Sequence, residues 1–495
     1  MEKLLKISQS DNVAVAISDI KKGETISLAS TQITTLSNIP FGHKIALQNI
    51  SANTEVVKYG HRIGRALCDI SIGEVVNENN LKTALEGFEK YTYEPVATTT
   101  KPQQTNKFFN GFLRSSGEVG TRNELWIIPL VACVNCVANE LVEKFRNSEY
   151  AKFTDGIFAL SHAYGCSQLG CDHANTRKIL TDFCKHPNAG GILVLGLGCE
   201  NNKMQDFKEE LGSFNPERIK FLQAQNSNDE ISDAFKLLVE LAMEMKNDVR
   251  TPQPISKLRI GLKCGGSDAF SGITANALIG KFSDKLIADG ASCVLCEVPE
   301  MFGAETLLMN RAISKDVFEK IVDMINSFKD YFIKSNMPIY ENPSPGNKAG
   351  GISTLEEKSL GCVQKGGTSP VCDVLRYAQR IKKEGLSLLE SPGNDPVAAT
   401  ALAAAGCQII LFSTGRGTPF SSVVPTVKIS SNTPLFAKKS NWIDFNAGEI
   451  LDGKNIDLLC ENFYKFVLEI AEGKKTQGEL HNYKEIAIFK TGITL

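Results

Sequence analysis

Three segments place glycines and polar side chains directly after short apolar runs, an arrangement that can bind small anions. The segments are Ile260–Asp268, Phe412–Pro419 and Leu195–Asn201. Each apolar run is typical of a buried strand, and ligands of open α/β sheets bind at the carboxyl ends of strands. Glycines let a ligand approach the backbone, and helix N-termini attract anions. None of the segments matches a complete nucleotide-binding fingerprint, so together they favour a small anionic ligand, although each alone could be a structural turn.

Two of the six histidines flank a segment rich in glycine and cysteine. His162 and His173 enclose residues 163–172, which contain two cysteines and an aspartate. This set could ligate a metal ion, although no standard zinc spacing is present. The alternative is a turn whose histidines and cysteines satisfy buried hydrogen bonds. The two C-x-x-C pairs, Cys133–Cys136 and Cys293–Cys296, have no partner pair at zinc spacing and are interpreted as mainly structural.

Two carboxylates follow the predicted strand 292–296. Glu297 and Glu300 could bind a metal or transfer protons. The alternative is that both are solvated loop residues. In the Phe412–Pro419 segment, Arg416 could form a bidentate pair with a carboxylate.

Composition excludes several classes of protein. The chain has 495 residues, a formal net charge of −2 and 42% hydrophobic residues, which gives no electrostatic case for binding nucleic acid or an anionic membrane. The most apolar stretch, Val397–Phe412, is too short and too mixed to span a bilayer, and no signal peptide is apparent. We therefore expect a cytoplasmic protein whose 14 cysteines are reduced.

The pattern of apolar residues predicts a multidomain α/β protein with a small all-β domain at its N-terminus. Three phrases in the first segment, at residues 19–24, 49–54 and 69–74, share a polar residue, an Ile and then a Gly or Asn suited to a turn. Farther along, strands alternate with helices, including predicted helices over 371–383 and 456–472. The expected parts are a β domain at 1–87, a linker at 88–107, a second α/β domain at 108–248 and a large C-terminal α/β domain at 249–495.

Long motifs spread along the whole chain resemble the galactarate/altronate dehydratase family. They include Gly42–Lys44, Lys58–Gly60, Gly120–Glu124, Ser161–Gln168, His186–Gly190, Gly196–Asn202, Cys264–Asp268, Glu297–Glu305, Glu341–Asn347, Ser413–Pro419 and Trp442–Phe445. The resemblance implies an N-terminal β-clip domain of the SAF type and a C-terminal domain with a mostly parallel sheet. It also implies a hydro-lyase of hexuronate catabolism that uses iron(II) to convert D-altronate to 2-dehydro-3-deoxy-D-gluconate. The alternatives are dehydration of galactarate or another aldarate, and a sugar-acid-binding protein without catalysis.

The sequence departs from the family pattern at one run. Family members commonly carry H-x-H-N near the end of the N-terminal domain, where this chain has Asn77-Glu78-Asn79-Asn80. Oxygen ligands are harder than imidazole, so a metal bound here would shift in preference toward manganese or magnesium.

Dehydration of a 2,3-dihydroxy acid removes the C2 proton and the C3 hydroxyl, which requires a base, an acid and stabilisation of an enolate. His162 or His173 is the expected acid or base because histidine titrates near neutral pH; His43 is a further acid or a metal ligand. The residues expected to bind substrate are Arg122, Gly265, Gly266, Ser267, Asp268, Arg416 and Thr418.

The expected cofactor is iron(II), with manganese(II) or an iron–sulfur cluster as alternatives. Candidate metal ligands are His43, Cys166, Cys199 and Glu297; a cluster could instead use Cys166, Cys199, Cys264 and Cys362, which all lie beside glycines. The expected partners are a small sugar acid and, as a general prior, a second copy of the chain in a homodimer.

Overall fold

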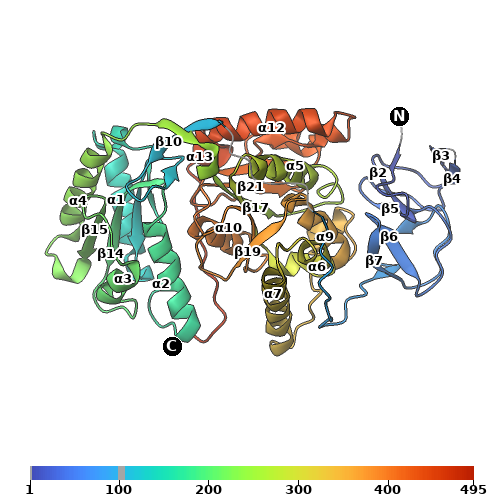
Figure 1. The fold of residues 1–495 in the computed structure, drawn as a ribbon, viewed down its shortest axis with the longest axis horizontal. Helices are drawn as coiled ribbons and strands as arrows, with labels where there is room; N and C mark the ends of the chain where they lie inside the picture. Colours follow the sequence, from blue (N-terminus) through green and yellow to red (C-terminus); the bar gives the residue numbers. More distant parts are fainter. Residues whose placement is uncertain (1–2, 30, 98–105) are drawn as a thin grey trace.

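The computed structural model of the protein describes residues 3–29, 31–97 and 106–495. Three domains follow one another along the chain, and the C-terminal domain lies between the other two in space (Figure 1). The segment after the N-terminal domain packs along the C-terminal domain, where the Tyr91 hydroxyl donates to Glu305 at 2.6 Å and the Tyr93 hydroxyl to the Ala312 carbonyl at 2.7 Å. No described helix is both long and apolar enough to cross a membrane.

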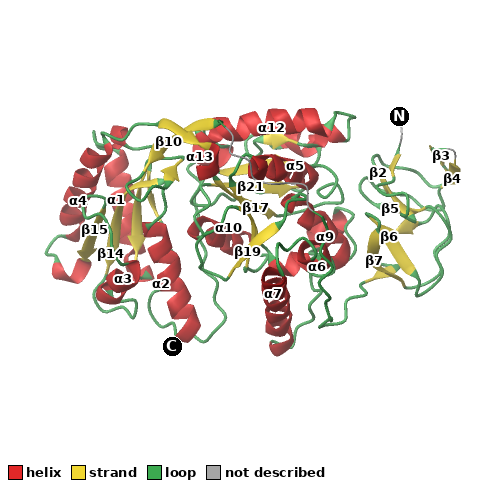
Figure 2. Ribbon diagram, viewed as in Figure 1, coloured by secondary structure: helices red, strands yellow, loops and turns green. Residues whose placement is uncertain are grey.

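The N-terminal domain is built from strands and loops (Figure 2). Its strands are β1 (Leu4–Leu5), β2 (Val13–Ala16), β3 (Thr25–Leu28), β4 (Thr31–Thr34), β5 (Lys44–Ala46), β6 (Glu55–Lys58), β7 (His61–Ala66), β8 (Val75–Val76) and β9 (Leu81–Lys82). The repeated turns predicted from the sequence are confirmed. Ile20, Ile50 and Ile70 are buried, and Gly23, Asn53 and Gly73 take positive φ angles, the conformation that Gly and Asn adopt at little cost.

The second domain has a four-stranded parallel sheet in the order β13-β12-β14-β15. The strands are β12 (Glu124–Pro129), β13 (Ile157–Ala159), β14 (Ala189–Gly196) and β15 (Ile219–Gln223), and the helices are α1 (Asn135–Arg146), α2 (Gly170–Cys184), α3 (Met204–Leu211) and α4 (Glu230–Met245). Alternate residues of β12 face opposite sides: Leu125 and Ile127 pack with α1 and α4, and Trp126 and Ile128 pack with α2 and α3. A small sheet of β10 (Phe108–Leu113), β11 (Val119–Gly120) and β16 (Thr251–Pro254) lies where this domain joins the next.

The C-terminal domain is built on a seven-stranded parallel sheet in the order β19-β20-β18-β17-β21-β22-β23. The strands are β17 (Arg259–Cys264), β18 (Ser292–Leu295), β19 (Val371–Leu375), β20 (Gly385–Leu389), β21 (Ile409–Thr414), β22 (Thr426–Ser430) and β23 (Phe445–Asn446). The helices are α5 (Ala275–Ala288), α6 (Glu305–Met309), α7 (Lys315–Lys334), α8 (Pro345–Ala349), α9 (Leu355–Cys362), α10 (Asp395–Ala404), α11 (Thr433–Lys438), α12 (Ile456–Ala471) and α13 (Gln477–Leu480). The predicted fold class, an all-β N-terminal domain followed by α/β domains with a mostly parallel sheet, is confirmed.

One predicted element is wrong. The sequence pattern predicts a helix over 371–383, but this segment forms the edge strand β19 followed by a loop. Pairing with β20 buries Val371 and Leu375, so tertiary contacts override a helix-like spacing of apolar residues. The helix predicted over 456–472 is confirmed as α12.

The joint between the second and C-terminal domains contains Arg122, which the sequence analysis assigned to substrate. Its Nε donates to Glu479 at 2.6 Å, and its two terminal nitrogens donate to Glu479 and to the carbonyls of Thr121, Ile470 and Lys474. Every guanidinium nitrogen is therefore engaged within the protein, and the side chain is buried. Arg122 therefore joins the two domains, and its guanidinium has no N–H left to bind a substrate carboxylate.

This assignment predicts a loss of stability and not a binding defect when Arg122 is replaced. We expect Arg122→Met to destabilise the protein by about 3–5 kcal/mol, because it leaves Glu479 as a buried unpaired charge. The KM of the folded fraction should stay unchanged. Calorimetric unfolding and steady-state kinetics would measure the two effects, with the exposed Arg416→Met as the matched control that should leave the melting temperature unchanged. An unaltered melting temperature with a raised KM for Arg122→Met would contradict this role.

Candidate active site

The carboxyl ends of three neighbouring strands bring together most of the residues that the sequence singled out. β17 lies between β18 and β21. The Gly265 N–H donates to the Ser413 carbonyl at 3.0 Å, and the Arg416 N–H donates to the Gly266 carbonyl at 3.0 Å. Segments 260–268 and 412–419 therefore meet at one edge of the sheet. The third segment, Leu195–Asn201, lies at the end of β14 in the second domain.

A chain of buried charges fills this edge. Lys263 Nζ lies 2.5 Å from Glu297 Oε1 and 2.9 Å from Asp395 Oδ1. Lys365 Nζ lies 3.4 Å from Glu297 Oε2. Lys263, Glu297 and Lys365 are all buried, and charges removed from water are tolerated only when they are paired and hydrogen-bonded. The pairing therefore fixes the position of each side chain.

Two thiols and a second carboxylate continue the chain of charges. Glu300 Oε2 lies 3.2 Å from Cys264 Sγ and 3.0 Å from Cys362 Sγ, and the two sulfurs are 3.3 Å apart. Lys365 donates to Cys264 Sγ at 2.9 Å, and Lys358 pairs with Glu300 at 2.8 Å. Burial alone would raise the pKa of the Glu300 carboxyl, but the ammonium groups of Lys358 and Lys365 outweigh it and lower that pKa. Glu300 is thus ionised at neutral pH.

The backbone at this edge is arranged around the carboxylates. Glu297 adopts a left-handed conformation with φ of 71°, which costs a residue other than glycine about 1–3 kcal/mol. Its carboxylate is bound by Lys263, Lys365 and the Cys264 N–H, and these bonds hold the strained conformation. At Gly265, a Cβ atom would lie 2.6 Å from the Asp395 carboxylate. Only glycine therefore lets β17 end beside that carboxylate.

The N-terminal domain closes over the edge through two lysines that share one carboxylate. Lys44 on β5 and Lys58 at the end of β6 each lie 2.8 Å from an oxygen of Glu357 on α9, and all three side chains are buried. Lys44 also donates to Ser353 Oγ and the Gly351 carbonyl. Burial would raise the pKa of Glu357, but the two ammonium groups lower it to about 2. This interaction fastens the small domain to the site.

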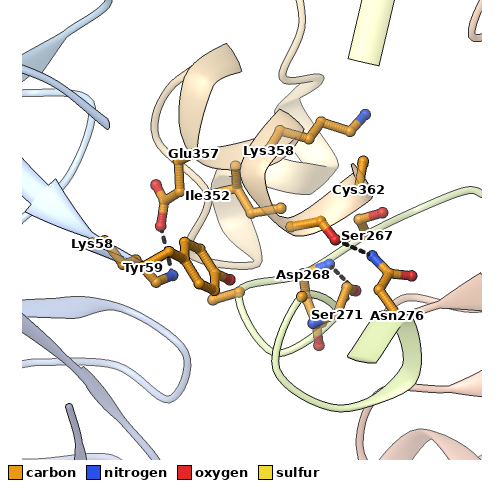
Figure 3. Close-up of a pocket in the computed structure, with 13 residues that line it drawn as sticks. Lys58, Tyr59, Ser267, Asp268, Ser271, Asn276, Ile352, Glu357, Lys358 and Cys362 are labelled. Carbon is orange, nitrogen blue, oxygen red and sulfur yellow. Dashed lines mark hydrogen bonds and ion pairs between the residues drawn. The ribbon is translucent and has the colours of Figure 1, made fainter. Parts of the chain in front are cut away.

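A narrow cavity lies where the two domains meet (Figure 3). Lys58 and Tyr59 line it from the N-terminal domain, while Ser267, Lys358 and Cys362 line it from the C-terminal domain. Ser267 Oγ is buried and has no hydrogen-bond partner among the described residues, which suits a group that awaits a ligand. The buried network consists of the ammonium groups of Lys44, Lys58, Lys263, Lys358 and Lys365 and the carboxylates of Glu297, Glu300, Glu357 and Asp395. One excess positive charge therefore remains in this network when the thiols are neutral.

The other predicted substrate-binding residues differ in whether their side chains are already hydrogen-bonded within the protein. The Asp268 carboxylate accepts hydrogen bonds from Ser271, Ser431 and Asn432 and serves to join these loops. Thr418 Oγ1 accepts from the Phe420 N–H at 3.2 Å. Arg416 is exposed beside Gly266, and its guanidinium has no partner among the described residues.

Two of the three predicted catalytic histidines are not at this site. His162 lies in the second domain, buried, with Nε2 2.8 Å from the Pro129 carbonyl and Nδ1 accepting from the Tyr164 N–H. His173 is in α2, where Nε2 lies 3.3 Å from Arg177. Burial lowers the pKa of both rings. Both satisfy local structure, which was the alternative interpretation of that segment.

His43 does lie at the junction between the N-terminal and C-terminal domains. It precedes Lys44, and a Cβ atom on the neighbouring Gly42 would lie 3.2 Å from the Gly350 carbonyl. Burial and the Lys44 charge lower the pKa of His43, while the Glu78 carboxylate acts in the opposite direction. Glu78 belongs to the run that departs from the family pattern. In that run Asn77 Oδ1 and Asn80 Oδ1 accept backbone N–H bonds at 3.0 and 2.9 Å, so both amides shape the turn.

The predicted metal ligands are divided among separate places. Cys166 and Cys199 lie in the second domain, His43 at the domain junction and Glu297 in the buried network. The four cysteines suggested for a cluster are likewise divided: Cys264 and Cys362 lie 3.3 Å apart in the C-terminal domain, and Cys166 and Cys199 lie in the second domain. Among the described residues, Cys264, Glu300 and Cys362 form one group whose donor atoms all lie within 4.8 Å of one another. Two thiols and a carboxylate suit iron(II) or zinc better than manganese or magnesium.

A larger groove lies between the second and C-terminal domains, lined by residues that include Arg114, Glu118 and Arg380. Arg380 pairs with Glu118 at 2.7 Å, and Arg114 pairs with Asp248 at 3.2 Å. Its principal charges are thus neutralised within the protein, unlike those of the buried network.

Comparison with known proteins agrees with this architecture. Family models match residues 2–84 as the altronate/galactarate dehydratase SAF domain, 111–246 as the second domain of D-galactarate dehydratase/altronate hydrolase and 255–494 as the C-terminal domain of D-galactarate/altronate dehydratase. The chain is 53% identical to altronate dehydratase of Bacillus subtilis strain 168, over 100% of both chains. The chain belongs to the galactarate/altronate dehydratase family.

Two further relatives support this membership. Altronate dehydratase of Escherichia coli K12 is 51% identical over 99% of both chains. Galactarate dehydratase (L-threo-forming) of Escherichia coli K12 is 34% identical over 98% of this chain and 96% of that protein.

The sequence analysis missed the lysines. Lys58, Lys263, Lys358 and Lys365 are all buried, although lysine is usually exposed. Lys358 lies in a run of Glu356, Glu357 and Lys358 that is typical of a solvated helix. The signal that could have found these residues is the position of Lys263, which directly follows the apolar run of a predicted buried strand and stands two residues before Gly265.

The shared carboxylate predicts a stability defect with a defined pH dependence. Replacing Glu357 with Gln leaves two buried ammonium groups unpaired and should cost about 3–5 kcal/mol at pH 7. The pKa of Glu357 is lowered from 4.5 in the unfolded chain to about 2 in the folded protein. Its stabilisation is therefore complete above pH 4.5 and is lost as the pH falls toward 2.

Calorimetric melting between pH 7 and pH 3 would measure this contribution. Glu357→Gln should lower the melting temperature at pH 7 and reduce its fall in acid. The control is Asp457→Asn, which removes an exposed pair with Lys281 and should cost at most about 1 kcal/mol. Equal effects of the two variants would refute the role of Glu357.

Proposed function

We propose that this protein dehydrates D-altronate to 2-dehydro-3-deoxy-D-gluconate. The observation that carries the proposal is the full-length identity of 51–53% to two altronate dehydratases, against 34% to a galactarate dehydratase. The buried network supports the same chemistry, because its excess positive charge and unpartnered Ser267 hydroxyl suit a small sugar acid.

The substrate carboxylate is proposed to bind at the cavity between the two domains, which in this structure has a volume of about 10 Å³, room for about one water molecule. The cavity must therefore widen to admit the rest of the sugar acid. Lys58 and Lys358 line it from the two domains, and the Lys358 side chain extends away from Lys58 (Figure 3), where its ammonium group pairs with Glu300. Burial lowers the pKa of Lys358, but Glu300 raises it further, so the pKa lies above the ordinary value for lysine. Lys358 thus stays charged at neutral pH and can stabilise the negative charge that develops when the C2 proton leaves. Ser267 Oγ is positioned to bond a carboxylate or hydroxyl oxygen.

Proton transfer at C2 requires a base that is unprotonated in the resting protein. His43 is our proposed base, because its pKa is lowered by burial and by the Lys44 charge and it belongs to the same domain junction as the cavity. A neutral imidazole accepts a proton readily at physiological pH.

The chemistry implies a divalent metal, and the donors Cys264, Cys362 and Glu300 fit iron(II). Bound there, iron(II) would supply Lewis-acid polarisation of substrate oxygens. Lys365 donates to Cys264 Sγ at 2.9 Å and would balance the charge of a metal-bound thiolate. All 14 cysteines are free, which supports a reducing location such as the cytoplasm. A homodimer remains our expectation for the assembly.

An assay of keto-acid formation tests the substrate and the metal together. Purified protein would be given D-altronate or galactarate anaerobically, with iron(II), with manganese(II) or with a chelator. We expect turnover of altronate with iron(II) and its loss with the chelator. Turnover of galactarate alone would show that galactarate, and not altronate, is the substrate. Binding of altronate without turnover under any condition would show a sugar-acid-binding protein.

Variants of the cavity test the proposed binding residues. Lys358→Met removes a charged hydrogen bond of about 1.5–3 kcal/mol, so kcat/KM should fall by roughly 10- to 150-fold. Ser267→Ala removes a neutral bond of about 1 kcal/mol and should raise KM by roughly five-fold. Lys382→Met, an exposed lysine, is the control. Unchanged kinetics in both cavity variants would place the substrate elsewhere.

A further inference from the structure

The second domain carries a repeated motif that the proposed reaction does not use. Ala132-Cys133-Val134-Asn135, Gly165-Cys166-Ser167-Gln168 and Gly198-Cys199-Glu200-Asn201 each place a small residue before a cysteine and an amide two residues after it. The three motifs follow β12, β13 and β14 in turn.

The sheet brings these three motifs to one edge. β12 lies between β13 and β14, and all three strands are parallel. Their carboxyl ends therefore point the same way, and the loops that leave them are neighbours. The edge lies at the base of α2, beside the end of the chain in Figure 1, where the Thr491 N–H donates to Asp172 at 3.0 Å.

Hydrogen bonds join the three loops directly. The Asn135 amide donates to the His162 carbonyl at 2.8 Å, and the Ala132 N–H donates to the Tyr164 carbonyl at 2.8 Å. Asn201 Oδ1 accepts from the Cys166 thiol at 3.2 Å and from the Ser167 N–H at 2.9 Å. The amides of the first and third motifs thus hold the segment that carries the second.

Close backbone approach explains one of the small residues. A Cβ atom on Gly165 would lie 2.0 Å from the Leu130 carbonyl oxygen and 2.6 Å from the Val131 Cα. No side chain fits there, so the glycine brings the Cys166 loop against the loop that follows β12.

The thiols face solvent although the loops beneath them are packed. Cys133, Cys166 and Cys199 are exposed, whereas the Gln168 side chain is buried, with neither amide atom bonded to any described residue. The buried Asn135 Oδ1 is unpartnered in the same way. A buried polar atom without a partner in the protein is one that a ligand or water can satisfy. Three accessible thiols and two amides with unpartnered atoms, all carried by the joined loops, support a ligand at this edge.

The three thiols do not form the tight donor group that a single ion needs. Among the described residues, the donor group within 4.8 Å of one another is Cys264, Glu300 and Cys362, so the sulfurs of the three motifs do not converge as tightly. A cubane holds its cysteine sulfurs on separate irons and thus farther apart than one ion does. The N-termini of α1 and α2 start at this edge and favour a negatively charged ligand.

We propose that Cys133, Cys166 and Cys199 bind a [4Fe–4S] cluster at the carboxyl edge of the second domain's sheet, with one iron not ligated by cysteine. Cys136 and Cys171 lie nearby but inside α1 and α2, outside the repeated motif, and are not ligands. This proposal goes beyond the proposed dehydration and stands independently of it, because the cluster lies in a different domain from the buried network.

Reconstitution and spectroscopy test the cluster without reference to activity. The full chain would be incubated anaerobically with iron(II) and sulfide and then desalted. We expect about four sulfides per chain and about four irons in addition to any iron(II) held by Cys264, Glu300 and Cys362, with a broad visible absorbance and an electron paramagnetic resonance signal after reduction. Iron without sulfide, or zinc with no iron, would overturn the proposal.

Single substitutions assign the ligands. Cys133→Ser, Cys166→Ser and Cys199→Ser should each lose at least half of the bound sulfide and the visible absorbance. Cys136→Ser and Cys171→Ser, which alter equally exposed neighbours, should retain both, as should Cys264→Ser at the buried network. Circular dichroism would confirm folding of each variant. Loss of the cluster in Cys264→Ser, or its retention in all three motif variants, would refute the assignment.

Discussion

The rest of the site depends on the pairing of buried charges between the N-terminal and C-terminal domains. Glu357 can remain ionised inside the protein because Lys44 and Lys58 both contact it, and neither lysine is tolerable there without Glu357. The same constraint governs the chain of contacts from Lys263 through Glu297 and Lys365. The small β domain is thus held against the larger domain by paired charges that water no longer screens and by an apolar core that the two domains share. The cavity lies where the two meet.

Much of the fold could be predicted, because the buried strands of both sheets are apolar runs bounded by glycines. The turns at Ile20, Ile50 and Ile70 were visible as a repeat. The strand β19 was mistaken for a helix, because its spacing of apolar residues fits both structures and only pairing with β20 decides. Local patterns cannot show which segment supplies a sheet edge.

The candidate site was predicted in part. The glycine-rich ends of β17 and β21 and the carboxylates after β18, each recognised separately in the sequence, meet because parallel strands share an edge. His162 and His173 lie instead in the second domain, where both rings make local contacts. The buried lysines were missed, because Lys44 and Lys58 are paired only with Glu357, which is about 300 residues away in the chain. Residues that pair over such a separation show no regular spacing in the sequence, so a sequence pattern cannot predict the pair.

The most direct test of the central claim is a crystal structure of the protein soaked anaerobically with D-altronate. If the paired charges between the two domains form the active site, electron density for the sugar acid will occupy the cavity, with its carboxylate within hydrogen-bond distance of Lys58 or Lys358 and of Ser267. Density at the groove beside Arg114, or at the edge that carries Cys133, Cys166 and Cys199, with an empty cavity between the domains, would contradict the account.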